Sequence, residues 1–350
     1  MTRYEQKQEM RKEKARETVL KEANTLEGWP EVRGYDFEGE FNFENFMKSY
    51  LTTGFQATNL AQAIEIIKEM RREKTDIFLG FTSNVGTSGM RENIKFLVKE
   101  KHLKAIATTV GAIEEDIIRV FKPWVLGSWD AKGEILREKG INKTGNIFCP
   151  NDRYLYFEKF MNRVLNRLYE RQKNEKKIIG IVEFVSELGR ELEMMEVESE
   201  ISKKALETSF TYWAYKNNMP IFCPALPDGS VGDMLYFFKK NNPDFKIDTS
   251  DYVVQVTDMA LNSKKMGLVC IGGSVPKHLF SNAALFRDGA DYAIFINNST
   301  EFDGSNAGTS LDEAISWGKI KHDAKRVKVE TEATLVLPLL IAGAFKLYEP

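Results

Sequence analysis

Apolar and polar positions alternate along this chain in blocks that predict strands, each followed by a helix. Five short apolar runs favour β-structure and lead through small or polar residues into helical segments: Asp76–Thr82, Ala105–Thr109, Ile221–Leu226, Gly267–Ile271 and Tyr292–Ile296. Strands that alternate with helices are joined by right-handed crossovers, which build a mostly parallel sheet covered on both faces. The pattern therefore predicts a doubly wound α/β domain, with ligands bound beyond the carboxyl ends of the strands.

Helical periodicity defines several further elements. The turn Ser83–Gly89 is expected to lead into a helix that ends near Lys101, and Ala112–Phe121 is expected to form another. The run Thr334–Phe345 is too short to span a bilayer and contains Pro338, so we expect a buried helix there. One apolar helical face is formed by Phe157, Phe160, Met161, Val164, Leu165 and Leu168.

The N-terminal segment differs from the rest of the chain. Residues 1–22 carry seven Lys or Arg and five Glu with few apolar residues between them, which is typical of a solvated helix or a frayed tail. Gly28-Trp29-Pro30 marks the entry to the globular part. We therefore expect a charged helical extension over residues 1–30 and a single domain over 31–350.

Composition narrows the class of protein. With 43% hydrophobic and 29% charged residues and a net charge of −2, the chain fits an ordinary soluble protein without a general affinity for nucleic acid or anionic membranes. The charged N-terminus does not read as a signal peptide, and the odd set Cys149, Cys223 and Cys270 indicates reduced thiols in the cytoplasm. The three histidines form no metal-ligand pair, so no metal site is expected.

Three strand-to-helix turns could hold the phosphates of a nucleotide. They are Thr82–Gly89, the segment Thr108–Gly111 with the acids at 114–116, and Gly272-Gly273-Ser274. Small residues let backbone N–H groups approach a phosphate at a helix N-terminus. None matches GxGxxG, and a plain turn with a Ser or Thr cap explains each of them at least as well.

The segments Asp303–Asn306 and Asp312–Lys319 hold the groups that a polyamine-binding enzyme needs. Carboxylates bind cationic amines, the Trp317 ring covers methylenes, and the Lys319 amine can form an imine once it has lost its proton. A lysine that favours a helix C-terminus is the commoner alternative. Glu313 and Trp317 share a helix face, whereas Lys319 would point about 200° from Trp317 on a continuous helix. We expect Gly318 to end that helix. Asp233 is another candidate amine anchor.

Several longer sequence words resemble the deoxyhypusine synthase family. They are Thr52–Ala57, Leu79–Asn84, Pro224–Ser230, Glu301–Ser305 and Ser316–Ile320, and the resemblance extends from about Val32 to Phe345. It implies a Rossmann-like, NAD-dependent enzyme that transfers the 4-aminobutyl group of spermidine to a lysine of the translation initiation factor 5A precursor. The products would be deoxyhypusine and 1,3-diaminopropane, formed via an imine on Lys319.

The resemblance also implies roles for individual residues. NAD contacts would fall on Ser83, Asn84, Thr109, Gly111, Glu115, Asp228, Gly273, Asp303, Thr331 and Glu332. The amine would meet Asp233, His278, Asn306, Glu313 and Trp317, and His278 or Glu313 would move protons beside Lys319. Family members form tetramers with sites across subunit interfaces, and an N-terminal helix covers a neighbour's active-site entrance. We therefore expect a homotetramer, or a heterotetramer with a paralogue.

The chain departs from the family pattern in its amine-binding loop. Asn306-Ala307-Gly308 stands where Asp-Ser-Gly is usual, and Phe295 stands where tyrosine is common. Three interpretations follow: a deoxyhypusine synthase with weaker spermidine affinity, a homospermidine synthase-like enzyme with putrescine as acceptor, or a weakly active subunit that needs a paralogous chain. The acidic stretch Glu187–Glu200 could receive a basic protein substrate, although a solvated helix is the simpler reading.

Overall fold

A computed structural model describes residues 2–21 and 26–349 and is built around one parallel sheet. The strands lie side by side in the order β11-β10-β9-β1-β2-β7, and every neighbouring pair is parallel. Their bounds are β1 Asp76–Phe81, β2 Ala105–Thr108, β7 Ile221–Phe222, β9 Met266–Ile271, β10 Ala290–Asn297 and β11 Ile320–Glu330. Numbered by their order in the chain, these six strands run 6-5-4-1-2-3, the order of doubly wound folds, and the order reverses between β1 and β9.

The five predicted strands are present, but the sheet has a sixth strand that the sequence pattern did not predict. The strand expected over Ile221–Leu226 is confined to Ile221–Phe222. The additional strand, β11, lies at the sheet edge and carries many exposed charged side chains. Charged residues are common on edge strands because they discourage pairing with another chain. In β11 these charged residues also interrupt the alternation of apolar and polar positions from which a strand is predicted.

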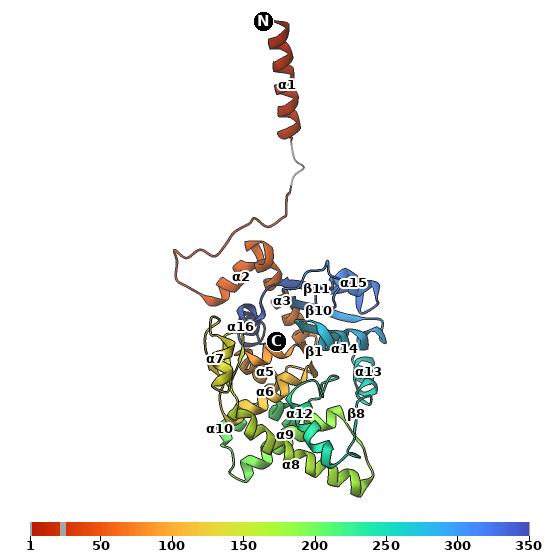
Figure 1. Cartoon of the computed structure of the whole chain (residues 1–350). Helices are drawn as coiled ribbons and strands as arrows, with labels where there is room; N and C mark the ends of the chain where they lie inside the picture. The colour runs from red at the N-terminus through yellow and green to blue at the C-terminus, as the bar shows by residue number, and fades with distance from the viewer. Residues whose placement is uncertain (1, 22–25, 350) are drawn as a thin grey trace.

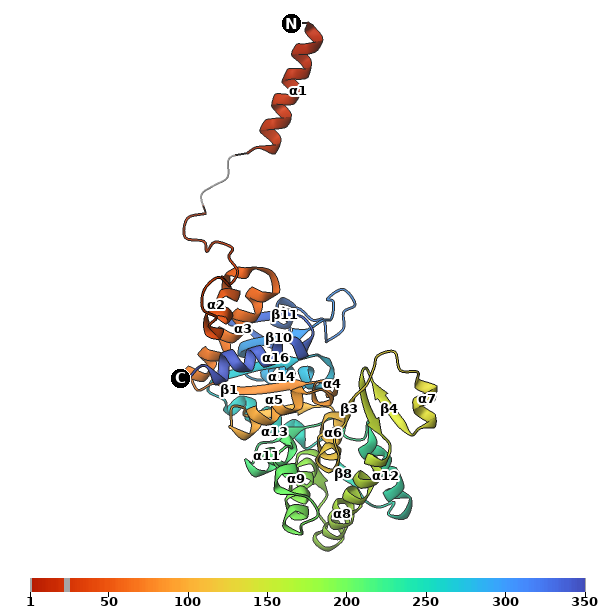
Figure 2. The ribbon, with the colours of Figure 1, turned by 90° about the vertical axis from the view of Figure 1, so that its left-hand side faces the viewer.

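Helices cover both faces of the sheet (Figures 1 and 2). On one face, alternate side chains such as Leu79 and Ile106 pack with α3 (Phe55–Arg72), α5 (Met90–Lys99), α6 (Val110–Phe121) and α16 (Ala333–Ile341). On the other face, Phe78 and Ala107 pack with α13 (Tyr252–Asn262), α14 (Ser274–Leu285) and α15 (Leu311–Ser316). Successive residues of a strand point to opposite faces, so each buried strand supplies both cores.

The chain between β2 and β7 forms a large excursion. It contains β3 Val125–Leu126, α7 Gly133–Glu138, β4 Ile141–Thr144, β5 Ile147–Pro150, α8 Asp152–Glu175, β6 Ile179–Gly180, α9 Ile181–Val197, α10 Lys203–Leu206 and α11 Phe210–Lys216. The six apolar residues predicted to share one helical face are all buried on α8. After β7 come α12 Ser230–Asn241 and β8 Ile247–Asp248, while α2 Phe43–Thr53 precedes α3.

The acidic stretch Glu187–Glu200 is not a free acidic surface. Glu187 pairs with Arg167 and Arg171 of α8, and Glu191 is fully buried between Arg163 and Arg167. Glu193, Glu198 and Glu200 also form ion pairs. These glutamates are neutralised by arginine and lysine side chains distant in sequence, so the stretch joins α9 to its neighbours instead of presenting charge to a basic partner.

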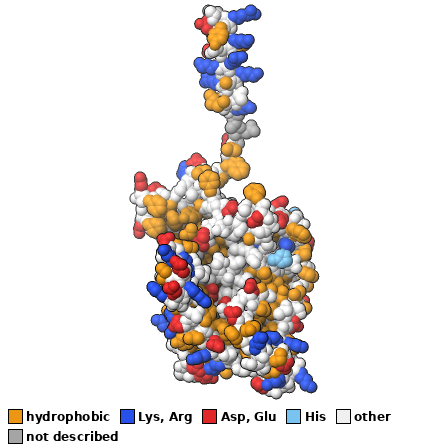
Figure 3. Space-filling model, in the orientation of Figure 1, with side chains coloured by type: hydrophobic (Ala, Val, Ile, Leu, Met, Phe, Trp, Pro, Cys, Tyr) orange, Lys and Arg blue, Asp and Glu red, His pale blue; other side chains and the backbone are white. Residues whose placement is uncertain are grey.

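The two ends of the described chain have contrasting environments. Helix α1 (Arg3–Val19) begins with a capping box between Thr2 and Glu5, has no buried residue, and carries charged side chains along its length (Figure 3). The predicted buried C-terminal helix is α16, which continues as a π-helix over Ala342–Lys346. No helix in the described ranges is long and apolar enough to cross a membrane.

Candidate functional site

The turns after β1 and β2 touch each other at the carboxyl edge of the sheet. Ser83 starts the short helix α4 (Ser83–Thr87), and its backbone N–H donates to Thr109 Oγ1 over 3.1 Å. Gly111, in the first turn of α6, approaches so closely that an added Cβ would lie 3.0 Å from Ser83 Cβ. The segment Ser83–Gly89, expected to be a turn, contains the short helix α4, and the helix expected after it is α5, which ends at Lys99.

Two adjacent glutamates of α6 extend this edge. The Glu115 carboxylate accepts a hydrogen bond from Thr87 Oγ1, and burial raises the pKa of Glu115 to about 7. The Glu114 carboxylate accepts the Val231 N–H over 2.9 Å, and burial raises its pKa as well. Glu114 thereby fixes the start of α12, next to the exposed Asp228. A raised carboxyl pKa caused by burial is common in functional sites.

The point where the strand order reverses brings a third turn to the same edge. Gly273, after β9, packs so tightly against Ala307 that any Cβ would overlap the Ala307 backbone. The loop that follows β10 therefore folds over this turn. Asp303 lies exposed in that loop, where hydrogen bonds from Ser305, the backbone N–H first, lower the pKa of its carboxyl.

Two further residues predicted to contact NAD, Thr331 and Glu332, follow β11. The Thr331 N–H donates to the Asn297 carbonyl over 2.9 Å, and the Glu332 carboxylate caps α16 at Thr334. Two buried polar atoms at this edge, Thr108 Oγ1 and Asn297 Nδ2, have no hydrogen-bond partner within the described chain. Unpartnered buried groups are costly, so their presence favours a polar ligand here.

Lys319 lies in a cavity of about 180 Å³. The residues that line this cavity together with Lys319 are Lys277, Ser281, Phe295, Gly304, Asn306, Thr309, Glu313, Ala314 and Trp317. The structure thus brings together four of the residues predicted to act on the amine: Asn306, Glu313, Trp317 and Lys319. They come from the long connection between β10 and β11, which folds against α14.

The position of Lys319 corrects one expectation. Ligands were expected beyond the carboxyl ends of the strands, but Lys319 directly precedes β11, and its carbonyl accepts the Ala290 N–H at the start of β10. Lys319 is therefore at the amino end of its strand. The connection begins at the carboxyl edge and must cross the sheet before a parallel strand can start, so the cavity lies over the face of the sheet.

Gly318 ends α15 as expected. Its φ of +71° belongs to the left-handed region that glycine tolerates, and it follows Trp317, the C-cap residue. The turn brings Lys319 Nζ to 5.4 Å from the centroid of the Trp317 ring. Trp317 is 63% exposed, which excludes a role in the core.

Lys277 lines this cavity too, although the sequence pattern did not indicate it. It is 2% exposed, its Nζ donates to the carbonyls of Asn306, Ala307 and Thr309, and it lies 4.2 Å from the centroid of the Phe295 ring. Burial lowers its pKa to about 8. The only available signal was a lysine on the apolar side of a predicted helix. The next residue, His278, lies on the exposed side of α14, and partial desolvation followed by the charge of Lys319 lowers its pKa.

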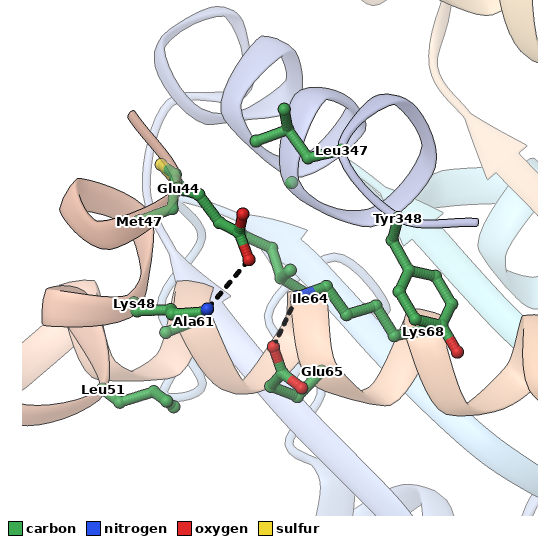
Figure 4. Close-up of a pocket in the computed structure, with 11 residues that line it drawn as sticks. Glu44, Met47, Lys48, Leu51, Ala61, Ile64, Glu65, Lys68, Leu347 and Tyr348 are labelled. Atoms are coloured by element: carbon green, nitrogen blue, oxygen red, sulfur yellow. Dashed lines mark hydrogen bonds and ion pairs between the residues drawn. The ribbon is translucent and has the colours of Figure 1, made fainter. Parts of the chain in front are cut away.

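Asp233 is not brought to Lys319 within one chain. It lines a different cavity with Asn142, Asn151, Tyr154, Ser230, Met234, Tyr236 and Phe237. A further cavity lies between α2, α3 and the C-terminal segment, where Glu44 pairs with Lys48 and Glu65 with Lys68 (Figure 4). No predicted site residue lines that cavity.

Fold and site together define a doubly wound α/β protein with polar residues at its switch point and a lysine-containing cavity beside it. The family model for deoxyhypusine synthase matches residues 45–344. The chain belongs to the deoxyhypusine synthase family.

Individual relatives agree with this assignment. The chain is 46% identical over 336 residues to a probable deoxyhypusine synthase of Methanocaldococcus jannaschii, covering 94% of this chain and all of that one. It is 40% identical over 360 residues to the deoxyhypusine synthase of Senecio vernalis, covering 95% and 94%. A crystal structure of a candidate deoxyhypusine synthase from Entamoeba histolytica superposes with a TM-score of 0.63 at 27% identity, covering 90% of this chain and 97% of that one.

Proposed function

We propose that this protein is a deoxyhypusine synthase that transfers the 4-aminobutyl group of spermidine to a lysine of the translation initiation factor 5A precursor. The observation that carries the proposal is the placement of Lys319. Gly318 releases Lys319 from the helix, so that its amine lies over the Trp317 ring in a cavity that also holds Glu313 and Asn306. An amine nucleophile, an aromatic face and a carboxylate are the groups that polyamine transfer requires.

The residues present fit NAD at the neighbouring carboxyl edge. Ser83, Thr109 and Gly111 form a close-packed backbone cradle, Glu115 offers a carboxylate for ribose hydroxyls, and the unpartnered Thr108 and Asn297 groups need polar partners. Asn84, Asp228, Gly273, Asp303, Thr331 and Glu332 would complete the contacts at the ends of the remaining strands. When bound, NAD would accept a hydride from the carbon next to the secondary amine of spermidine and later return it.

The side chains of this protein would carry the transfer itself. Lys319 attacks the oxidised carbon, 1,3-diaminopropane leaves with the original nitrogen, and the aminobutyl group stays on Lys319 as an imine. The acceptor lysine then attacks the same carbon and displaces Lys319. His278, whose lowered pKa keeps it neutral near pH 7, can accept a proton from an attacking ammonium, as can the Glu313 carboxylate.

The test is to trap the aminobutyl group on the protein. Purified full-length protein is incubated with NAD and spermidine, reduced with borohydride and analysed by mass spectrometry. We expect an aminobutyl adduct on Lys319 with release of 1,3-diaminopropane, and no adduct in Lys319→Arg. An adduct on another lysine, or diaminopropane release that Lys319→Arg leaves unchanged, would contradict the proposed role of Lys319.

A partner-dependent subunit is the second candidate, and one observation favours it. Asn306 stands where the family pattern usually has an acid, so the amine site lacks one negative charge. NAD binding without an adduct would support this candidate, and adding the paralogous chain should then restore the adduct. A homospermidine synthase-like activity would instead pass the aminobutyl group from the unreduced Lys319 imine to putrescine that is added before the borohydride, and the Lys319 adduct would then be lost.

A further inference from the structure

Two buried polar atoms in the Lys319 cavity have no hydrogen-bond partner within the described chain. They are Ser281 Oγ, on α14, and Asn306 Oδ1, on the loop opposite. Ser281 is 3% exposed, so its hydroxyl cannot rely on bulk water. Leaving a buried polar group unpaired costs about 1–3 kcal/mol, and two such atoms lining one cavity point to a ligand that pairs with both.

The surrounding protein explains why neither atom is satisfied internally. A helical serine can donate to the carbonyl four residues before it, but the Ser281 hydroxyl makes no such bond. A strong donor, Lys277, lies one turn earlier on the same face of α14. Its three N–H groups are directed at the Asn306, Ala307 and Thr309 carbonyls, at 2.8, 3.4 and 3.4 Å. Lys277 therefore holds the loop in place and leaves both side-chain oxygens free.

The chemistry of these two oxygens selects the ligand group. Asn306 Oδ1 can only accept, so a carboxylate or phosphate, which also accepts, would be repelled. A primary amine supplies two or three N–H donors on an alkyl stem, and the Phe295 and Trp317 rings line the same cavity for that stem. The resemblance already assigns Asn306 to the amine; we propose that the Ser281 hydroxyl binds the same terminal primary amine of the polyamine, which makes Ser281 a specificity residue of this site. The inference rests on the proposed function.

The clamp differs in kind from a carboxylate. Two neutral dipoles bind an amine through the direction of their hydrogen bonds more than through charge, so each side chain should contribute to the affinity. Removal of the Ser281 hydroxyl should lower the affinity only of ligands that carry the amine it binds. Because the Ser281 hydroxyl has no hydrogen-bond partner among the described residues, Ser281→Ala should also leave the Tm of the ligand-free protein unchanged or slightly raised. A merely structural serine would lower the Tm when replaced.

The experiment titrates three amines by calorimetry into full-length protein saturated with NADH, which cannot accept a hydride, so that the heats report binding and not reaction. They are spermidine, N-butyl-1,3-diaminopropane, which lacks the terminal amine of the butyl arm, and N-propyl-1,4-diaminobutane, which lacks that of the propyl arm. Ser281→Ala and Asn306→Leu are compared with wild type. Ser263→Ala is the matched control, since Ser263 is 5% exposed but its hydroxyl is satisfied by the Met259 carbonyl at 2.9 Å.

We expect Ser281→Ala to weaken spermidine binding by roughly ten-fold, the scale of a hydrogen bond to a charged group. The analogue that keeps the held amine should lose affinity by the same factor and the other should lose none, which identifies the arm. Equal losses for both analogues, or unchanged spermidine binding, would overturn the inference alone. Failure of spermidine to bind the wild-type protein would overturn the proposed function and the inference with it.

Discussion

At the scale of single residues, the neutral side chain of Asn306 is the most consequential feature of the amine cavity. Its backbone carbonyl is held by Lys277, and its Oδ1 has no partner within the described chain. An acid at this position would add a full charge where the proposed substrate carries an ammonium group. Such charge-assisted hydrogen bonds contribute more than neutral ones.

We therefore predict that Asn306→Asp lowers the KM for spermidine by several-fold to about ten-fold, because hydrogen bonds to charged groups contribute about 1.5–3 kcal/mol. Steady-state kinetics over a range of spermidine concentrations would measure the change. The control is Asn262→Asp, which adds the same charge at the exposed end of α13. A KM that is unchanged or raised would contradict the view that Asn306 weakens the amine site.

Glu115 permits a pH-dependent test at the same scale. Burial raises its pKa from 4.5 to about 7, so between these values the folded protein holds a proton that the unfolded chain has released. The folded state is then the more protonated one, and Glu115 costs stability as the pH rises from about 4.5 to about 7. Above pH 7 Glu115 is ionised in both the folded and the unfolded state, and its full destabilising effect is present.

Glu115→Gln removes this cost, and we expect it to raise the free energy of unfolding at pH 8 by on the order of 2 kcal/mol, with little gain at pH 4.5. Urea denaturation at the two pH values would measure both effects. Glu100→Gln, at the exposed end of α5, serves as the control. A gain of the same size at both pH values would contradict the assignment. The substitution should also weaken NAD binding if the carboxylate contacts ribose.

At the scale of elements, the end of α15 decides whether Lys319 can act. The helix has only six residues, and Gly318 at a φ of +71° turns the chain out of it and into β11. A side chain at this φ is strained by roughly 1 kcal/mol, and an added Cβ would lie 3.1 Å from Leu285 Cδ1. The strain would be relieved by moving Lys319 away from Trp317.

We predict that Gly318→Ala slows formation of the Lys319 adduct at least ten-fold while changing spermidine affinity less, since Glu313, Asn306 and Ser281 stay in place. The matched control is Gly140→Ala. Gly140 also follows a six-residue helix, α7, has a φ of +64°, and its nearest atom to an added Cβ is 3.9 Å away. Both variants should lose similar stability. Equal loss of adduct in the two would show that the effect is general strain.

At the scale of the whole molecule, one chain does not assemble all the residues assigned to the amine. Asp233 and Lys319 line separate cavities, while Trp317 and Phe302 are 63% and 99% exposed. Helix α1 buries no residue of its own, and its expected role in covering a neighbouring site stays a prediction. These features suit a site completed by a second copy across a symmetric interface.

Complementation between two inactive variants tests this arrangement. Asp233→Asn and Lys319→Ala should each abolish transfer. Subunits mixed under dissociating conditions and reassembled should recover about a quarter of the activity, because half of the randomly formed dimers are mixed and each has one intact site. Mixing without dissociation is the control. If reassembled mixtures stay inactive, Asp233 and Lys319 act from the same chain or Asp233 has no role.

How far the sequence could predict this structure depended on the kind of pattern at each segment. The buried strands and the apolar face of α8 were predictable because burial on both sides selects apolar residues at fixed spacing. The strand β11 was not, since an exposed edge carries charged residues that break the alternation. Lys277 was missed for a related reason. Its burial depends on three carbonyls that lie about 30 residues further along the chain.

The sequence by itself determined the doubly wound class, the strand-end turns and the family, because these depend on local periodicity and on unbroken runs of residues. It also predicted that Gly318 ends its helix, since that requires only one backbone conformation. Tertiary structure alone decided which residues share a cavity. It placed Lys319 at the amino end of β11 and put Asp233 in a different cavity. It also left one polar atom each of Ser281 and Asn306, which line the Lys319 cavity, without a partner within the described chain. Those relations join segments far apart in the chain, and only packing of the helices on the sheet fixes such distances.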